Sequence, residues 1–297
     1  MLHSGVPAAS KRAAFRAGLE SGRLLRFPGA FNPLSAMLIE RRGFEGVYVS
    51  GAVLAADLGL PDIGLTTLTE VAGRSAQIAR VTGLPALVDA DTGFGEPMNV
   101  ARTVQMIEDA GLAGLHIEDQ VNPKRCGHLD GKDVVDRDVA IRRIKAAVAA
   151  RRDPAFVVAA RTDAASVHGL DDAIERAKAY ADAGADLIFP EALGDEASFE
   201  RFRAAVDVPI LANMTEFGKS PLLSVSTLES LGVIVVIYPV TLLRLAMDAA
   251  GAGLTAIAEH GTQEGLLDRM QHRQDLYDLL DYQAYNTFDN GIYNFEL

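Results

Sequence analysis

The sequence predicts an α/β protein folded as a (β/α)8 TIM-type barrel. Eight short apolar or β-branched runs alternate with eight segments whose apolar residues recur at helical spacing. Each run is apolar enough to be covered on both faces, as the strands of a parallel barrel are. No Pro-, Gly- or Ser-rich linker and no change of composition divides the chain, so residues 1–297 are expected to form a single domain. A doubly wound open sheet is the alternative, but it would more often show fewer strands and a Gly-rich phosphate turn, which residues 29–32 do not form.

The expected elements follow one another along most of the chain. A basic, alanine-rich segment at 10–22 is expected to be a leading helix. The strands are expected at 24–27, 46–50, 86–91, 114–118, 156–161, 186–191, 209–215 and 233–239. The helices are expected at 33–42, 67–82, 99–110, 136–151, 170–183, 196–205, 226–231 and 241–260.

Residue types at the helix ends support these boundaries. Thr67 with Glu70, and Ser226 with Glu229, have the spacing of a capping box. A glycine, the residue that most readily adopts the left-handed conformation of a helix C-terminus, follows five of the helices. These glycines are Gly43, Gly83, Gly111, Gly184 and Gly232.

The last part of the chain lies beyond the eight repeating units. One extra helix is expected at 266–280, followed by a tail in which three tyrosines and two phenylalanines fall between 282 and 295. This tail is more apolar than a free terminus needs to be. We therefore expect it to pack against the barrel or against another subunit.

Composition limits the classes of partner and the cellular location. The net charge of −12 disfavours nucleic acid and anionic membranes as main partners, because both are negatively charged. A single cysteine excludes an intrachain disulfide, which fits a reducing compartment. Residues 1–24 lack the apolar core of a signal peptide, and the longest apolar run, 232–240, is too short to span a bilayer. A soluble, cytoplasmic protein is expected.

Polar residues gather at the predicted carboxyl ends of the strands, where barrel enzymes place their reacting groups. Residues two apart on a strand face the same way, so Asp89 pairs with Asp91, and His116 pairs with Glu118. An isolated polar residue at such a position is usually a cap or a turn former, but convergence from six strands favours a site. The other strand ends contribute Tyr48, Ser50, Gly51, Arg161, Glu191, Asn213 and Thr215.

The acidic residues of this set predict a divalent metal. Asp89 and Asp91 face one enclosed site, and two carboxylates there do not ionise together easily unless a cation compensates. With Glu118 they offer three hard oxygen donors, which suit Mg²⁺ or Mn²⁺ held largely through water. The alternative is that these carboxylates pair with Arg161 only to hold the barrel together.

The remaining strand-end residues predict a small anionic ligand. Arg161 is suited to clamp a carboxylate, and Asn213 and Thr215 offer neutral hydrogen bonds. Ser50 and the backbone amide of Gly51 could cradle an anion. No Ser-His-Asp arrangement, P-loop or dinucleotide fingerprint competes with this interpretation.

A long basic loop follows the fourth predicted strand. Residues 121–133 include Lys124-Arg125-Cys126-Gly127-His128, which places the only cysteine of the chain among three potentially cationic side chains. Loops of this length without regular structure are uncommon and usually functional. The alternative for the loop alone is a solvated turn, but its position above the acidic cluster favours a lid.

Eight ordered sequence blocks resemble the isocitrate lyase and phosphoenolpyruvate mutase superfamily, over residues 14–285. The cysteine loop is typical of the lyases and is absent from the mutases, and the short chain together with Arg125 favours the methylisocitrate-cleaving branch. The blocks are Tyr48–Gly51, Gly59–Asp62, Val88–Gly95, His116–Gln120, Lys124–His128, Ala160–Asp163, Phe189–Glu191 and Leu211–Glu216.

The resemblance implies a retro-Claisen cleavage of (2S,3R)-2-methylisocitrate to pyruvate and succinate, within the methylcitrate cycle of propionate catabolism. It implies that Asp62 lies near the metal site with Asp89, Asp91 and Glu118, and that Cys126 is the general acid. It also implies a homotetramer with exchanged C-terminal helices. The catalytic set is expected to be Cys126, Tyr48, Arg161, His116 and Lys124, with Tyr48 the candidate for removing the hydroxyl proton. The substrate is expected to contact Ser50, Gly51, Ala52, Cys126, Gly127, Arg161, Glu191, Asn213, Thr215, Arg244 and Arg273.

Three alternatives to this activity stay open from the sequence. Isocitrate, dimethylmalate or oxaloacetate chemistry on the same scaffold would need the same acidic pair, and a methyl contact is worth only ~1–3 kcal/mol. Phosphoenolpyruvate mutase chemistry has no carbanion for Cys126 to protonate. A non-catalytic carboxylate-binding barrel would not call for a cysteine acid.

The protonation state of the cysteine poses a separate question. A thiol of ordinary pKa is mostly protonated at neutral pH, as a general acid requires. Lys124, Arg125 and His128 are nevertheless expected to lower the pKa of Cys126. A loop that is open in the free enzyme and closes over dianionic substrate would reconcile the two expectations.

Overall fold

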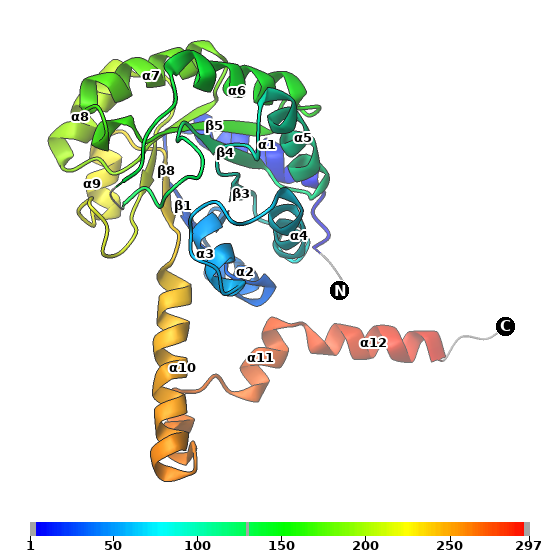
Figure 1. Ribbon diagram of the computed structural model, residues 1–297. Helices are drawn as coiled ribbons and strands as arrows, with labels where there is room; N and C mark the ends of the chain where they lie inside the picture. The colour runs from blue at the N-terminus through cyan, green and yellow to red at the C-terminus, as the bar shows by residue number, and fades with distance from the viewer. Residues whose placement is uncertain (1–3, 129–130, 294–297) are drawn as a thin grey trace.

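The computed structural model describes residues 4–128 and 131–293. Figure 1 shows a round α/β body from which one long helix projects, followed by an arm that leads to the C-terminus. The body has a parallel sheet surrounded by helices, and its strand–helix order is the order of a (β/α)8 barrel. The predicted fold class is confirmed.

All eight predicted strands are present, and every ladder between them is parallel. One sheet has the order β2-β3-β4-β5-β6, and the other has the order β1-β8-β7. The two sheets are connected only by the isolated parallel bridges Gly29↔Tyr48, between β1 and β2, and Ile188↔Ile210, between β6 and β7, among the described residues. The strands are β1 (Leu25–Pro28), β2 (Val47–Val49), β3 (Ala86–Asp89), β4 (Gly114–Glu118), β5 (Val157–Thr162), β6 (Leu187–Pro190), β7 (Leu211–Asn213) and β8 (Val235–Tyr238).

The helices of the body confirm the predicted periodicity. The capping box of Thr67 and Glu70 is present, but Ser226 is not a cap, because the side chain of Ser224 accepts the Thr227 N–H instead. Gly83 has no left-handed backbone, unlike the other four glycines named above. The helices are α1 (Ala8–Glu20), α2 (Pro33–Arg41), α3 (Gly51–Asp57), α4 (Leu68–Ala79), α5 (Pro97–Asp109), α6 (Arg137–Ala150), α7 (Leu170–Asp182), α8 (Glu196–Ala205), α9 (Val225–Ser230) and α10 (Thr241–His260).

The C-terminal prediction was partly wrong. The expected helix at 266–280 is broken into a 3₁₀ turn, η2 (Glu264–Arg269), and a short helix, α11 (Arg273–Leu279). The expected tail instead forms a helix, α12 (Tyr282–Tyr293). Helix α3 was also not predicted, because its seven residues are too few to show a period.

The apolar core explains why the polar residues gather at one end of the barrel. Helix α1 closes the amino-terminal end, where Phe15 packs against Phe27 with ring centroids 5.0 Å apart. A larger apolar layer lies between the strands and the surrounding helices. Because the barrel interior is filled from below, the carboxyl ends of the strands are where polar side chains meet.

Helix α10 differs from the helices of the body, because none of its residues is buried. It continues from β8 away from the body (Figure 1). Among the described residues, α10 is the one helix long and apolar enough to cross a membrane by length and composition, which alone is weak evidence for a span.

Candidate active site

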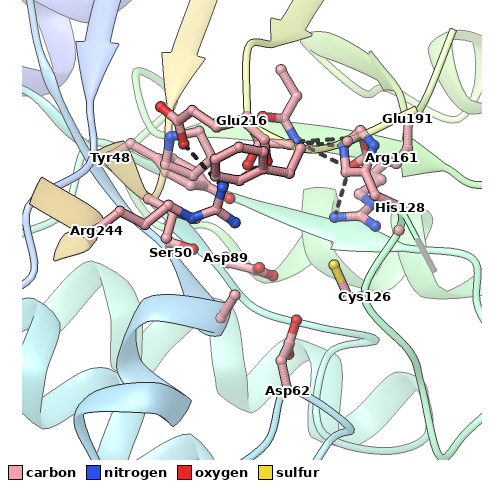
Figure 2. Close-up of a pocket in the computed structure, with 18 of the residues that line it drawn as sticks. Tyr48, Ser50, Asp62, Asp89, Cys126, His128, Arg161, Glu191, Glu216 and Arg244 are labelled. Carbon is pink, nitrogen blue, oxygen red and sulfur yellow. Dashed lines mark hydrogen bonds and ion pairs between the residues drawn. The ribbon is translucent and has the colours of Figure 1, made fainter. Parts of the chain in front are cut away.

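A pocket of about 230 Å³ lies at the carboxyl ends of the strands, beneath the loop after β4. This volume is below the usual range for drug-sized ligands, so the pocket fits a small organic acid better than a nucleotide. Figure 2 shows Cys126 reaching it from the loop, opposite Asp89 and Ser50, with Arg161, Glu191 and His128 grouped at one side.

Two of the predicted acidic residues converge where β3 ends. Asp89 Oδ2 accepts a 3.3 Å hydrogen bond from the Gly51 N–H. A Cβ atom added to Gly51 would lie 2.9 Å from Asp89 Oδ2 and 3.5 Å from Asp91 Oδ1, so both carboxylates face the same small space. Burial and the neighbouring charge of Asp89 raise the pKa of Asp91 to about 6. The two carboxylates thus do not ionise together easily, as the sequence predicted.

Lys124 of the loop supplies a cation to this cluster. Its Nζ lies 2.5 Å from Asp62 Oδ1 and 2.8 Å from Asp91 Oδ1. Burial alone would lower the pKa of Lys124, but the carboxylates of Glu118, Asp89 and Asp91 raise it well above its ordinary value. The strand ends therefore bind positive charge strongly.

The predicted metal ligands do not form a complete set by themselves. Within residues 4–128 and 131–293, no three His, Cys, Asp or Glu side chains are grouped closely enough to hold a metal ion. Asp62 pairs with Lys124 rather than with the other carboxylates. Three or more direct protein ligands are thus not found in the described part of the chain, and the donors fit the water-mediated arrangement that Mg²⁺ prefers.

Glu118 carries the best evidence that these residues fit a hydrated cation. Both of its carboxylate oxygens are buried and accept no hydrogen bond from the described residues, although Oε2 lies 3.3 Å from Arg161 Nε. Burial raises the pKa of Glu118 well above its ordinary value. Unpartnered buried oxygens are costly in a protein, and the water shell of a divalent ion would supply the missing donors.

Arg161 connects three carboxylates at the other side of the pocket. Its Nε lies 3.3 Å from Glu118 and 2.9 Å from Asp163, and its Nη1 lies 3.1 Å from Glu191. The guanidinium is buried and also lies over the ring of Phe189. Arg161 therefore does pair with carboxylates of the barrel, as the alternative from the sequence had it. The same guanidinium also lines the pocket, where a substrate carboxylate would meet it.

The loop cysteine has a raised pKa, which is the opposite of the predicted direction. Burial is the largest cause, and the charges of Asp62 and Glu191 add to it. Lys124 is already neutralised by two carboxylates, so it does not stabilise a thiolate. Cys126 is thus held as a thiol with the loop over the site, and an open loop is not needed to explain a protonated cysteine.

His128 of the same loop contributes to the site, although it was not among the predicted site residues. Its Nε2 lies 3.0 Å from Glu191 Oε1, and its Nδ1 accepts the Lys219 backbone N–H at 3.0 Å. Because Nδ1 is an acceptor, Nε2 carries the proton and donates it to Glu191. The Lys-Arg-Cys-Gly-His sequence was a sufficient signal for including it.

Tyr48 and His116 form a buried pair across β2 and β4. Tyr48 Oη lies 2.7 Å from His116 Nε2, which in turn lies 3.7 Å from Asp89 Oδ1. Burial and the charge of Asp89 raise the pKa of Tyr48 well above its ordinary value. A tyrosinate is therefore disfavoured, and Tyr48 is suited to hydrogen bonding rather than to removing a proton from the hydroxyl group.

The other predicted substrate contacts divide into three groups. Ser50, Ala52, Gly127, Asn213, Thr215 and Arg244 line the pocket together with the residues above. Gly51 does not line it, and its N–H is used by Asp89. Arg273 does not line the pocket of its own chain but lies at the exposed start of α11, so its expected contact with substrate stays a prediction. The lining also includes residues that sequence reasoning missed: Glu216, Phe217, Gly218, Pro239 and Val240.

Comparison with known proteins gives consistent results. Residues 15–258 match the family model described as phosphoenolpyruvate phosphomutase. The chain is 65% identical to the probable 2-methylisocitrate lyase 1 of Corynebacterium glutamicum, over 99% of this chain and 97% of that protein. It is 46% identical to the 2-methylisocitrate lyase of Salmonella typhimurium, over 94% of this chain and 96% of that protein.

Solved structures resemble the whole chain. An oxaloacetate acetylhydrolase in complex with 3,3-difluorooxalacetate superposes with a TM-score of 0.91 at 35% identity, covering 98% of this chain and 100% of that one. A phosphonopyruvate hydrolase in complex with oxalate and Mg²⁺ superposes with a TM-score of 0.86 at 30% identity, covering 94% of this chain and 98% of that one.

Proposed function

The chain belongs to the phosphoenolpyruvate phosphomutase family, and from this premise we propose that it cleaves 2-methylisocitrate to pyruvate and succinate. It is an enzyme, a carbon–carbon lyase. The observation that carries the substrate assignment is its 65% identity, over nearly the full length of both chains, to a protein named as a probable 2-methylisocitrate lyase. The site agrees, because the half-buried thiol of Cys126 faces a small pocket that is lined by carboxylates and by the guanidinium groups of Arg161 and Arg244.

Mg²⁺ is the proposed metal, and Mn²⁺ is a possible substitute. Asp89 and Asp91 are the candidates for holding it, with Glu118 and Asp62 binding its water molecules. When bound, the ion would stabilise the alkoxide and then the carbonyl of the fragment that becomes pyruvate. The support from this chain is that the two buried oxygens of Glu118 accept no hydrogen bond from the described residues and that Asp89 and Asp91 converge.

The protein groups have separate tasks in this cleavage. As the bond between C2 and C3 breaks, its electron pair passes to C3 and the 2-hydroxyl proton leaves with formation of the pyruvate carbonyl. Cys126 donates its thiol proton to C3, and the resulting thiolate later takes up a proton from water. Arg161, Asn213 and Thr215 line the side of the pocket where the charge of the succinate fragment would develop. The hydroxyl proton passes to water and balances the proton that the thiolate later takes up, since the raised pKa of Tyr48 keeps this residue a neutral phenol that cannot accept it.

Two sister activities are the alternatives that the test must separate. Isocitrate lacks one methyl group, and a methyl contact changes the specificity constant by only about 10- to 200-fold. Phosphoenolpyruvate mutase chemistry produces no carbanion for a thiol to protonate, so Cys126 at the pocket argues against it.

We further propose a cytoplasmic homotetramer in which C-terminal helices are exchanged between subunits. A barrel needs a helix over β8 and β1, but α10 leaves that place and buries none of its own residues. An apolar groove remains there, lined by residues that include Pro28, Ile39 and Phe44. An equivalent helix from a second chain would cover this groove and bury the exposed apolar side of α10.

The decisive experiment is a product assay with purified protein. With Mg²⁺ and 2-methylisocitrate, pyruvate and succinate should form in equal amounts. Addition of excess EDTA should stop the reaction, and renewed Mg²⁺ should restore it. If no pyruvate forms from 2-methylisocitrate while phosphonopyruvate is produced from phosphoenolpyruvate, the proposed reaction is wrong.

A further inference from the structure

Lys132 lies at the far end of the cysteine loop and makes two contacts that connect the loop to the barrel. Its Nζ donates a hydrogen bond to the Gly127 carbonyl oxygen and another, of 2.8 Å, to Asp163 Oδ1. Its side chain is 3% exposed and that of Asp163 is 0% exposed. Burial of an ammonium group is costly unless it is paired, so this lysine is held by specific partners rather than by apolar packing.

The barrel anchor for Lys132 is fixed independently of the loop. Asp163 Oδ2 accepts a 2.9 Å hydrogen bond from Arg161 Nε, and its backbone N–H donates to Asp119 Oδ1 at 2.9 Å. Burial alone would raise the pKa of Asp163, but the charges of Arg161 and Lys132 hold it at about 2. Loss of Lys132 would therefore leave Asp163 in place, ionised and still paired.

The loop contact of Lys132 lies next to the thiol. Gly127, whose carbonyl it binds, directly follows Cys126 and packs closely on the barrel. A Cβ atom at Gly127 would lie 2.3 Å from Arg161 Nη2 and 2.5 Å from Glu191 Cγ. On the other side of Cys126, Gln120 binds the Arg125 backbone at both its N–H and its carbonyl, at 2.8 and 2.9 Å.

We propose that Lys132 is a positioning residue for Cys126, because it fixes the peptide after the cysteine against the Asp163–Arg161 pair. Gln120 fixes the peptide before it, so the thiol is carried on a short backbone segment held at both ends. A displacement of about 1 Å of a reacting group can reduce a rate by about 10²-fold, so loss of this constraint should lower the turnover rate. The inference rests on the proposed lyase function, for which Cys126 is the proton donor.

Lys132 is not among the residues that line the pocket, so its effect should be on turnover rather than on substrate affinity. In Lys132→Met the apolar stem is kept and both Nζ contacts are lost. Lys132→Arg keeps the charge opposite Asp163, and Lys132→Gln is a milder neutral change if the methionine variant is poorly folded. Lys178→Met is the matched control, because Lys178 is half exposed on α7 and pairs with Glu175.

The experiment measures kcat, KM and the alkylation rate of Cys126 by iodoacetamide in all four variants, with thermal unfolding as a check of folding. Since the chain has one cysteine, alkylation reports on this thiol alone. For Lys132→Met we expect kcat to fall about 10²-fold with KM within about threefold of the unaltered enzyme. Alkylation should become about 10-fold faster, because the loop segment opens more often. Lys132→Arg should recover most of both properties, and Lys178→Met should change neither.

Two results would overturn the proposal. One is a folded Lys132→Met or Lys132→Gln enzyme with unchanged kcat and unchanged alkylation. The other is a fall in kcat that Lys178→Met reproduces. Failure of the proposed function would look different, since the unaltered enzyme would then not release pyruvate from 2-methylisocitrate, while alkylation of the variants would still report on the positioning of Cys126.

Discussion

The strand-end pocket and the C-terminal arm, α10 to α12, both depart from the usual arrangement, in which charged side chains are exposed and large apolar side chains are buried. In the pocket, charged groups such as Asp89, Lys124 and Arg161 are buried. In the arm, large apolar side chains such as Leu245 and Leu254 are exposed, at 64% and 69%. Each arrangement is unfavourable for an isolated chain and therefore indicates what the region contacts.

The difference teaches that the two regions are suited to different kinds of partner. Buried charges that are paired with one another, and oxygens that lack a donor, require a small charged ligand and a cation. Exposed leucines along one helix favour contact with an apolar surface, and in the proposed tetramer the groove beside β1 and β8 of a second chain would provide it. The predictions below test whether the two regions can be disrupted separately.

The largest expected effect is from removal of the metal. Chelation with EDTA should reduce turnover of 2-methylisocitrate by about 10³-fold or more, because the ion provides several kcal/mol of stabilisation to the developing charge. The oligomer should be unaffected, since exposed apolar residues of α10 such as Leu245 and Leu254 do not line the pocket. Activity assays and light scattering on the same sample measure both. Full activity in EDTA would contradict the assignment of Asp89 and Asp91.

The second effect is from Cys126→Ser. A serine hydroxyl is a much weaker acid than a thiol, so turnover should fall by about 10²-fold or more, the usual contribution of a general acid. Binding of pyruvate with Mg²⁺, measured by calorimetry, should be retained. A serine variant with full turnover would show that the proton comes from elsewhere.

The third effect should be confined to the arm. Leu245→Asp combined with Leu254→Asp places charge on the exposed apolar side of α10, and the tetramer should dissociate to smaller species. The matched control is His260→Gln, at the exposed end of the same helix. Native mass spectrometry separates the outcomes, and an intact tetramer in the double variant would rule out α10 as an interface.

The smallest effect concerns the pH dependence of stability. Burial lowers the pKa of His116 to about 4, below the ordinary value of 6.5. Between these two pH values the unfolded chain binds a proton that the folded chain does not, so stability is complete above about pH 6.5 and is lost as the pH falls toward 4. The loss assigned to this residue is about 3 kcal/mol, and urea unfolding of His116→Gln should show a correspondingly flatter pH dependence. An unchanged slope would contradict it.

The sequence predicted the barrel well because its evidence is local and repeated eight times. Runs such as Leu187–Pro190 are apolar throughout, and helix starts such as Thr67 carry their own caps. It predicted the arm less well, since the packing of α11 and α12 depends on contacts that no short-range pattern records. For the same reason it does not show which chain's pocket Arg273 would reach.

The site was predicted in composition but not in its internal pairing. Strand-end spacing identified Asp89, Glu118 and Arg161, all of which are buried together. No sequence pattern indicates that Lys124 pairs with Asp62 and Asp91, or that the effect of burial on the pKa of Cys126 outweighs that of its basic neighbours. These features depend on three-dimensional distance and on desolvation, which residue order does not contain.

The central claim is that the pocket cleaves 2-methylisocitrate, and a side-by-side assay of two substrates tests it most directly. Initial rates of pyruvate release from 2-methylisocitrate and of glyoxylate release from isocitrate are measured with the same enzyme and Mg²⁺. We predict a specificity constant, kcat/KM, at least about 10-fold higher for 2-methylisocitrate, the effect expected of one well-placed methyl contact. A higher kcat/KM for isocitrate would contradict the account.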